Sequence, residues 1–147
     1  LRAPDPLAPM AEERGARVAV GAEPDIMAAC RQARQLAERL GFSRTGAYHV
    51  ATAASELAAN LWIHGGGGLF LANPVVDVIS SGPVIGIELL AEDQGPGIAD
   101  LPLALTEGYS TGAGLGCGLP GVKRLMDEFT IDSGPGRGTR VRAIKWR

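Results

Sequence analysis

Cysteine and long apolar runs are both scarce in this sequence. The 147 residues include two cysteines, Cys30 and Cys117, which lie far apart and lack the close spacing typical of structural metal sites. No apolar run reaches the roughly 18 residues needed to cross a bilayer, and no signal peptide is recognisable. We therefore expect a cytoplasmic protein that does not enter a membrane.

The sequence also lacks a strong net charge. Its formal value of −2 provides no global field for holding nucleic acid, so no nucleic-acid partner is expected. Basic residues do gather near the C-terminus, at Arg137, Arg140, Arg142, Lys145 and Arg147. They fit either the solvated face of a final strand, which is the simpler interpretation, or a docking patch for an acidic partner.

Length and composition indicate one globular domain. Hydrophobic residues make up 46% of the chain and charged residues 20%, which is an ordinary balance for a protein with a packed core. The first nine residues include three prolines. We expect residues 1–15 to form a flexible tail and residues 16–147 to form a single domain.

Periodicity and turn signals predict the order of the elements. Residues 23–40 have helical spacing, and Ser43 is a suitable N-cap for a second helix that ends near His64, before four glycines. A third helix is expected at residues 119–129, with Asn-Pro and Ser-Gly-Pro turns between strands at residues 17–20, 69–71, 75–79, 84–92, 129–133 and 139–146. This order predicts an α+β fold, a two-layer sandwich with a mixed, mostly antiparallel sheet and helices on one face.

The segment from residue 93 to residue 118 is the most informative. Asp93 ends an apolar stretch and precedes a tight turn with Gly95 and Gly97, and a glycine-rich loop follows. A rigidly placed carboxylate can read a base amino group, and glycines let backbone N–H groups approach phosphate closely. The combination suggests a nucleotide site, although glycines can also serve only to cap helices and form turns.

Two familiar phosphate-binding motifs do not explain this loop. Gly116, Gly118 and Gly121 match the G-x-G-x-x-G dinucleotide fingerprint, but a polar segment rather than a strand precedes them. The P-loop pattern G-x-x-x-x-G-K-[ST] is absent from the sequence. A Rossmann or P-loop site is therefore not expected.

The second predicted helix carries residues suited to phosphoryl transfer. Glu56 and Asn60 are four residues apart and share one helix face, with His64 one turn further on. The Asn60 carbonyl oxygen suits Mg²⁺, and Glu56 could deprotonate an attacking hydroxyl. Taken alone, the pair would fit an amphipathic surface helix better than a catalytic site, but the acid turn and glycine loop downstream favour catalysis.

Four segments of the chain together resemble the GHKL, or Bergerat-fold, ATPase and kinase superfamily. Residues 55–60 (SELAAN), 93–98 (DQGPGI), 114–119 (GLGCGL) and 136–139 (GRGT) are similar to its N, G1, G2 and G3 boxes in order. Within the superfamily, residues 108–129 resemble the RsbT-type switch kinases of bacterial stressosomes, relatives of the anti-sigma kinases RsbW and SpoIIAB. The resemblance implies the Bergerat type of α/β sandwich.

The resemblance also implies roles for individual residues. Glu56 matches the catalytic base, Asn60 the Mg²⁺ ligand, and Asp93 the acid that binds the adenine amino group of ATP. Thr139 matches the G3-box position behind Asp93. The remaining positions implied to bind ATP lie in the turn under the base and in the lid: Gly95, Gly97, Ile98, Ser110, Thr111, Gly112, Gly114, Leu115, Gly116, Gly118 and Leu119.

The implied activity is ATP-dependent phosphorylation of a serine or threonine on a STAS-domain partner. A kinase of this type, once released, activates a PP2C-type phosphatase by direct binding. Two alternatives stay open: an anti-sigma factor that sequesters a sigma subunit, and a non-catalytic, nucleotide-dependent binding module. The pair of Glu56 and Asn60 argues against the last, since a pure binder needs no base. The oligomeric state is left open.

Overall fold

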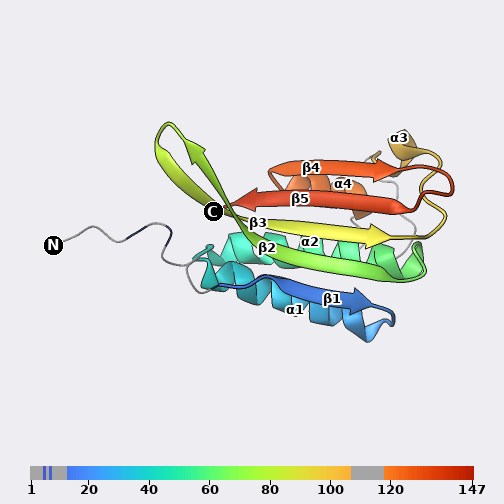
Figure 1. Ribbon diagram of the computed structural model, residues 1–147, viewed down its shortest axis with the longest axis horizontal. Helices are drawn as coiled ribbons and strands as arrows, with labels where there is room; N and C mark the ends of the chain where they lie inside the picture. The colour runs from blue at the N-terminus through green and yellow to red at the C-terminus, as the bar shows by residue number, and fades with distance from the viewer. Residues whose placement is uncertain (1–4, 6, 8–12, 107–117) are drawn as a thin grey trace.

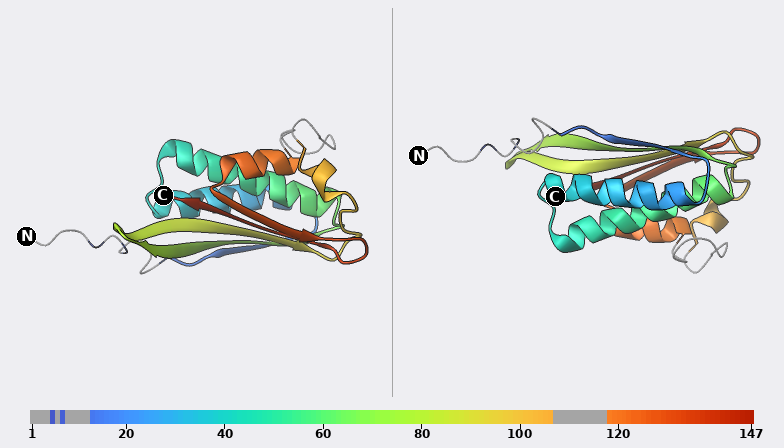
Figure 2. Two further views of the ribbon diagram at one scale, coloured as in Figure 1. Left: turned by 90° about the horizontal axis from the view of Figure 1, so that it is seen from above. Right: turned by 90° about the horizontal axis from the view of Figure 1, so that it is seen from below.

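The computed structural model describes residues 5, 7, 13–106 and 118–147 of the chain. In these ranges a five-stranded sheet has the order β1-β2-β3-β5-β4, and the helices cover one of its faces (Figures 1 and 2). The predicted two-layer α+β fold is confirmed, and each of the four described strand pairings is antiparallel. The elements are β1 (Ala16–Val20), α1 (Pro24–Arg39), α2 (Arg44–Ile63), β2 (Gly68–Ile79), β3 (Gly82–Asp93), α3 (Leu101–Ala104), α4 (Gly118–Leu125), β4 (Glu128–Ser133) and β5 (Thr139–Trp146).

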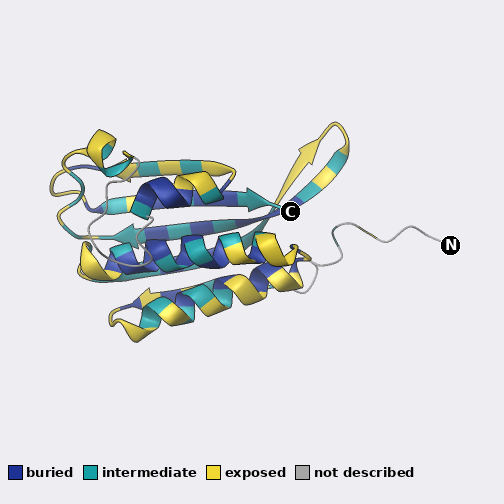
Figure 3. Cartoon of the chain, turned by 180° about the vertical axis from the view of Figure 1, so that it is seen from behind, coloured by how far each residue is buried: buried dark blue, intermediate teal, exposed yellow. Residues whose placement is uncertain are grey.

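Alternation along β3 separates the core from the outer face of the sheet. Ile85, Ile87 and Leu89 are at most 1% exposed, and they point toward the helices because successive strand residues face opposite sides. Helices α1 and α2 meet them mainly with buried alanine and leucine (Figure 3). This packing fixes the position of β3, whose last residue is Asp93.

Helix α2 begins and ends where the sequence predicts. The Ser43 Oγ caps it by accepting a hydrogen bond from the Gly46 N–H at 3.0 Å. At the other end, the Gly67 N–H donates to the Leu61 carbonyl at 2.8 Å. Gly66 and Gly67 have φ values of +73° and +106°, a conformation that favours glycine and turns the chain toward β2.

The turn predicted at Asn73-Pro74 is wrong, because β2 runs straight through it. Strand β1 pairs with β2 only as far as Ala72, so Pro74 lies where β2 has become an edge strand. A proline is tolerated on an edge because no second neighbour needs its missing N–H. The predicted Ser-Gly-Pro turn does join β2 to β3, and this hairpin extends past the rest of the sheet (Figure 1).

Two helices also differ from the prediction. Helix α4 ends at Leu125 rather than at residue 129, because the Asp127 N–H already donates to the Ile144 carbonyl of β5 at 2.8 Å. The short helix α3 was not predicted, although Asp100 caps it by accepting from the Leu103 N–H at 3.0 Å. Within the described ranges, no helix is both long and apolar enough to span a membrane.

The C-terminal basic residues are largely engaged within the chain. Arg142 Nε lies 2.6 Å from a Glu88 oxygen, and Arg140 Nε lies 2.8 Å from a Glu92 oxygen. Both pairs cross from β5 to β3 on the face of the sheet away from the helices. The charges therefore fit the solvated face of a final strand better than a docking patch for an acidic partner.

Candidate active site

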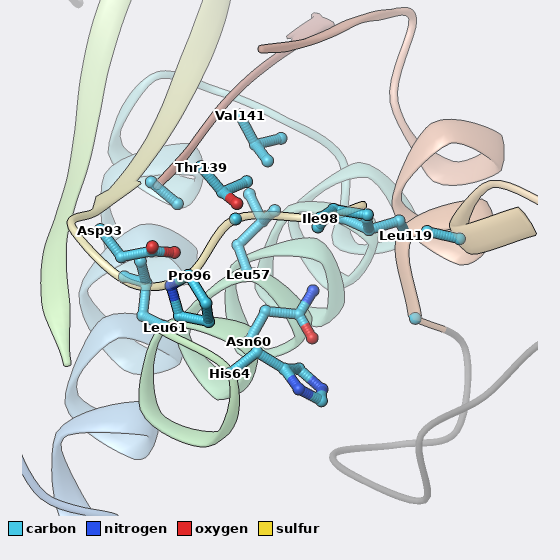
Figure 4. A pocket seen from close by; sticks show the side chains of 14 residues that line it. Leu57, Asn60, Leu61, His64, Asp93, Pro96, Ile98, Leu119, Thr139 and Val141 are labelled. Atoms are coloured by element: carbon cyan, nitrogen blue, oxygen red, sulfur yellow. The ribbon is translucent and has the colours of Figure 1, made fainter. Parts of the chain in front are cut away.

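A cavity of about 270 Å³ lies between α2, the end of β3 and the start of α4 (Figure 4). Its size is close to the lower end of small-molecule sites, which are commonly about 300–1000 Å³. Its walls are mostly aliphatic, which suits a flat aromatic ring. The lining residues are Leu57, Asn60, Leu61, His64, Ala91, Asp93, Pro96, Gly97, Ile98, Ala104, Gly118, Leu119, Thr139 and Val141.

Asp93 presents its carboxylate at one end of this cavity (Figure 4). It pairs in register with Thr139, and its Oδ1 accepts a hydrogen bond from the Gly95 N–H at 2.9 Å. Gly97 has a φ of +78°, and a Cβ at this position would lie 2.0 Å from the Gly134 carbonyl oxygen. The turn beneath the cavity therefore requires glycine at residue 97, and it holds the acid in one orientation.

Ser133 ties this turn to the β4–β5 hairpin, and the sequence did not point to it. Its side chain is 7% exposed; Oγ accepts from the Ile98 N–H at 2.8 Å and donates to the Gly138 carbonyl at 2.9 Å. Thr139 Oγ1 lies 2.8 Å from Ser133 Oγ. Since the one hydroxyl hydrogen of Ser133 is used on Gly138, Thr139 is the donor to Ser133.

Ser133→Ala is expected to lower the free energy of unfolding by about 1–3 kcal/mol, because it leaves the Ile98 N–H unpaired. It should also weaken nucleotide binding, since Ile98 lines the cavity. Urea unfolding and calorimetric titration with ATP measure the two effects. Ser80→Ala, at an exposed residue of the β2–β3 turn, is the matched control. Equal stability of the two variants would contradict this role for Ser133.

Glu56 and Asn60, which the sequence predicts on one face of α2, have different surroundings in the structure. Asn60 lines the cavity, whereas Glu56 is 1% exposed and is not among the lining residues. The Gly118 N–H, at the start of α4, donates to Glu56 Oε2 at 3.3 Å. The expected base therefore lies behind the cavity wall, next to the first turn of α4.

Charge is sparse in the part of the cavity that the structure describes. Only Asp93 and His64 among the lining residues can carry a charge. His64 lies on the same side of α2 as Asn60, four residues further on (Figure 4). The cavity therefore carries one acidic side chain, at Asp93, while the Asn60 amide and the His64 imidazole lie together at the end of α2.

A magnesium ion fits the Asn60 end only with help from a ligand. Among the described residues, no group of three or more His, Cys, Asp or Glu side chains is placed to hold a metal. Asn60 offers one hard carbonyl oxygen. Mg²⁺ commonly takes one or two protein oxygens and completes its shell with substrate phosphates and water, so this donor set suits the ion only in company with a nucleotide.

The structure gathers most of the predicted nucleotide-binding residues that it describes. Asn60, Asp93, Gly97, Ile98, Gly118, Leu119 and Thr139 all line the cavity, and Gly95 binds the Asp93 carboxylate. Ser110, Thr111, Gly112, Gly114, Leu115 and Gly116 lie outside the described residues. The apolar lining of the cavity was not predicted. Two of its residues, Ala91 and Val141, stand two positions from Asp93 and Thr139 on the same strand face.

A family model and individual relatives both show sequence similarity to this chain. Residues 20–145 match the family described as Histidine kinase-like ATPase domain. The chain is 45% identical over 129 residues to the serine/threonine-protein kinase RsbT of Bacillus subtilis (strain 168), covering 88% of this chain and 94% of that protein. It is 33% identical over 104 residues to the anti-sigma F factor of Thermoanaerobacter sp. (strain X514), covering 66% and 68%.

A solved structure shares the fold. The crystal structure of the RsbU and RsbW domains of Rv1364c from Mycobacterium tuberculosis superposes with a TM-score of 0.59 at 15% sequence identity. The match covers 92% of this chain, which spans about a third (33%) of that longer protein. At this identity the likeness supports the architecture alone.

Proposed function

This chain belongs to the histidine kinase-like ATPase family and is a protein serine/threonine kinase; from that premise, we propose that Asp93, Asn60 and Glu56 divide the reaction with ATP among them. The observation that carries the proposal is the arrangement along one cavity. The Asp93 carboxylate, held by the Gly95 N–H, and the Asn60 amide both line this cavity, and most of the remaining lining residues are aliphatic (Figure 4). Adenine would lie at the Asp93 end, and the phosphates would lie toward Asn60 and the start of α4.

Asp93 is suited to accept a hydrogen bond from the adenine 6-amino group. Gly95 donates to its Oδ1, so the carboxylate cannot turn freely and keeps acceptor capacity for a ligand. Leu57, Ala91 and Val141 line the same cavity and can contact the faces of the ring. A half-buried acceptor in an apolar wall gives base selectivity, because a ligand lacking the amino group leaves it unpaired.

Glu56 is placed to act as the general base for a serine or threonine hydroxyl. As the hydroxyl oxygen forms its bond to the γ-phosphorus, the bond from that phosphorus to the bridging oxygen breaks and ADP leaves. Glu56 takes the hydroxyl proton. Because Glu56 is 1% exposed and lies next to the start of α4, its carboxylate has to become accessible when the substrate hydroxyl arrives. Movement of the first turn of α4 would provide this access.

Asn60 is the residue that would hold Mg²⁺, through its side-chain oxygen. When bound, the ion neutralises charge that develops on the phosphates. Helix α4 has eight residues, and its dipole favours negative charge at the end that begins at Gly118. The ion and this helix end would together meet the phosphate charge.

Asn60→Ala is expected to reduce Mg²⁺-dependent ATP affinity by about tenfold or more, while affinity without Mg²⁺ changes little. The reason is that only the metal contact is removed. Calorimetric titrations with ATP in the presence and absence of Mg²⁺ measure the two affinities separately. Asn73→Ala, on the edge of β2 and away from the cavity, is the control. An equal loss of affinity in both titrations would contradict the assignment of Asn60 as a metal ligand.

The phosphate acceptor is proposed to be a STAS-domain protein, and the released kinase to activate a PP2C-type phosphatase as a partner-switching regulator. The support is similarity: 45% identity to RsbT across most of both chains, against 33% to the anti-sigma F factor over a shorter segment. The anti-sigma similarity keeps sequestration of a sigma subunit as the second candidate. Mass spectrometry of a STAS partner incubated with the kinase, ATP and Mg²⁺ tests the proposal. One added phosphate on serine or threonine is expected, and an unmodified partner would contradict it.

A further inference from the structure

The four consecutive glycines at residues 65–68 have different physical reasons to be glycine. Gly66 and Gly67 have positive φ values, and a Cβ at Gly68 would lie 2.3 Å from the Glu92 carbonyl oxygen. Backbone conformation and backbone contacts therefore require glycine at these three positions, where α2 ends and β2 approaches β3. Gly65 is different, because its φ is not in the positive range and backbone strain does not explain it.

What excludes a side chain at Gly65 is the side chain of Asp93. An added Cβ would lie 2.6 Å from Asp93 Cβ and Cγ and 2.7 Å from Oδ2, and these are the three nearest atoms. Carbon atoms do not approach this closely without displacement. Oδ1 on the other side is held by the Gly95 N–H at 2.9 Å. The carboxylate is thus enclosed between the backbones of Gly65 and Gly95.

We propose that Gly65 is a positioning residue that sets the base specificity of the site through the Asp93 carboxylate. Without a side chain at residue 65, the Asp93 carboxylate can lie against the Gly65 backbone with Oδ2, while the Gly95 N–H binds Oδ1. A methyl group there pushes the carboxylate away and breaks the Gly95 hydrogen bond or turns the acceptor from the cavity. The inference rests on the proposed function, since it takes adenine as the ligand read by Asp93.

The test compares ATP with purine riboside 5′-triphosphate, which lacks the 6-amino group. The wild-type protein is expected to bind ATP about tenfold or more tightly than the analogue. Gly65→Ala should reduce this ratio to roughly 1–3 by weakening ATP more than the analogue, and Gly21→Ala should leave it unchanged. Gly21 is a matched control, because a Cβ there meets nothing within 4 Å and its φ is not positive.

The outcomes separate this inference from the proposed function. If the wild type binds no ATP, both fail. If the wild type prefers ATP and Gly65→Ala keeps the same ratio, the inference alone fails. Should Gly65→Ala prove too unstable to titrate, its double variant with Asp93→Gly is compared with Asp93→Gly alone. Equal thermal midpoints support the inference, since the clashing atoms are gone, and a much lower midpoint for the double variant overturns it.

Discussion

Glu56→Gln is expected to reduce phosphoryl transfer to the protein substrate by about 10²- to 10⁴-fold while ATP affinity stays nearly unchanged. Glutamine keeps the size of the side chain but cannot take the hydroxyl proton. Glu56 is also outside the cavity wall, so adenine and the phosphates do not depend on it for binding. Single-turnover transfer at saturating ATP measures the chemical step without a contribution from product release.

The control for this variant is Glu38→Gln, an exposed position on α1 remote from the cavity. Its transfer rate should match that of the wild type. Glutamine at residue 56 can still accept from the Gly118 N–H through its carbonyl oxygen, so α4 should keep its place. Transfer by Glu56→Gln within threefold of the wild-type rate would remove Glu56 from the role of base.

Asp93→Asn is expected to weaken ATP binding by about 10- to 100-fold, with a smaller effect on turnover at saturating ATP. If the asparagine carbonyl accepts from the Gly95 N–H, its NH₂ faces the cavity and meets the adenine amino group donor to donor. Calorimetric titration measures the loss. Asp132→Asn serves as the control, since Asp132 is exposed and its carboxylate is 3.4 Å from Arg137. Unchanged ATP affinity in Asp93→Asn would contradict the adenine assignment.

The parts of the fold that local sequence signals determine, such as the ends of helices, were predictable from the sequence. The Ser43 cap and the glycines after α2 fix that helix at both ends, and both were read correctly. The turn at Asn73-Pro74 was misread because proline is excluded only from strands with two neighbours. How far β1 reaches along β2 depends on pairing between distant segments, which a short window does not contain.

The candidate site was predictable as a set of residues but not as a geometry. Spacing puts Glu56 and Asn60 on one helix face, yet the approach of α4 buries the first and leaves the second at the cavity. Ser133 binds the Ile98 N–H from 35 residues away and carries no local motif. Gly65 looked like part of a helix stop, and only its distance from Asp93 shows a separate reason for it.

A crystal structure of the protein with Mg²⁺ and a non-hydrolysable ATP analogue tests the proposed nucleotide site most directly. We expect the adenine 6-amino nitrogen within hydrogen-bonding distance of the Asp93 carboxylate, and the Asn60 side-chain oxygen on the metal. The phosphates should lie near the start of α4. A nucleotide bound outside this cavity, or with its base next to Asn60 rather than Asp93, would contradict these assignments.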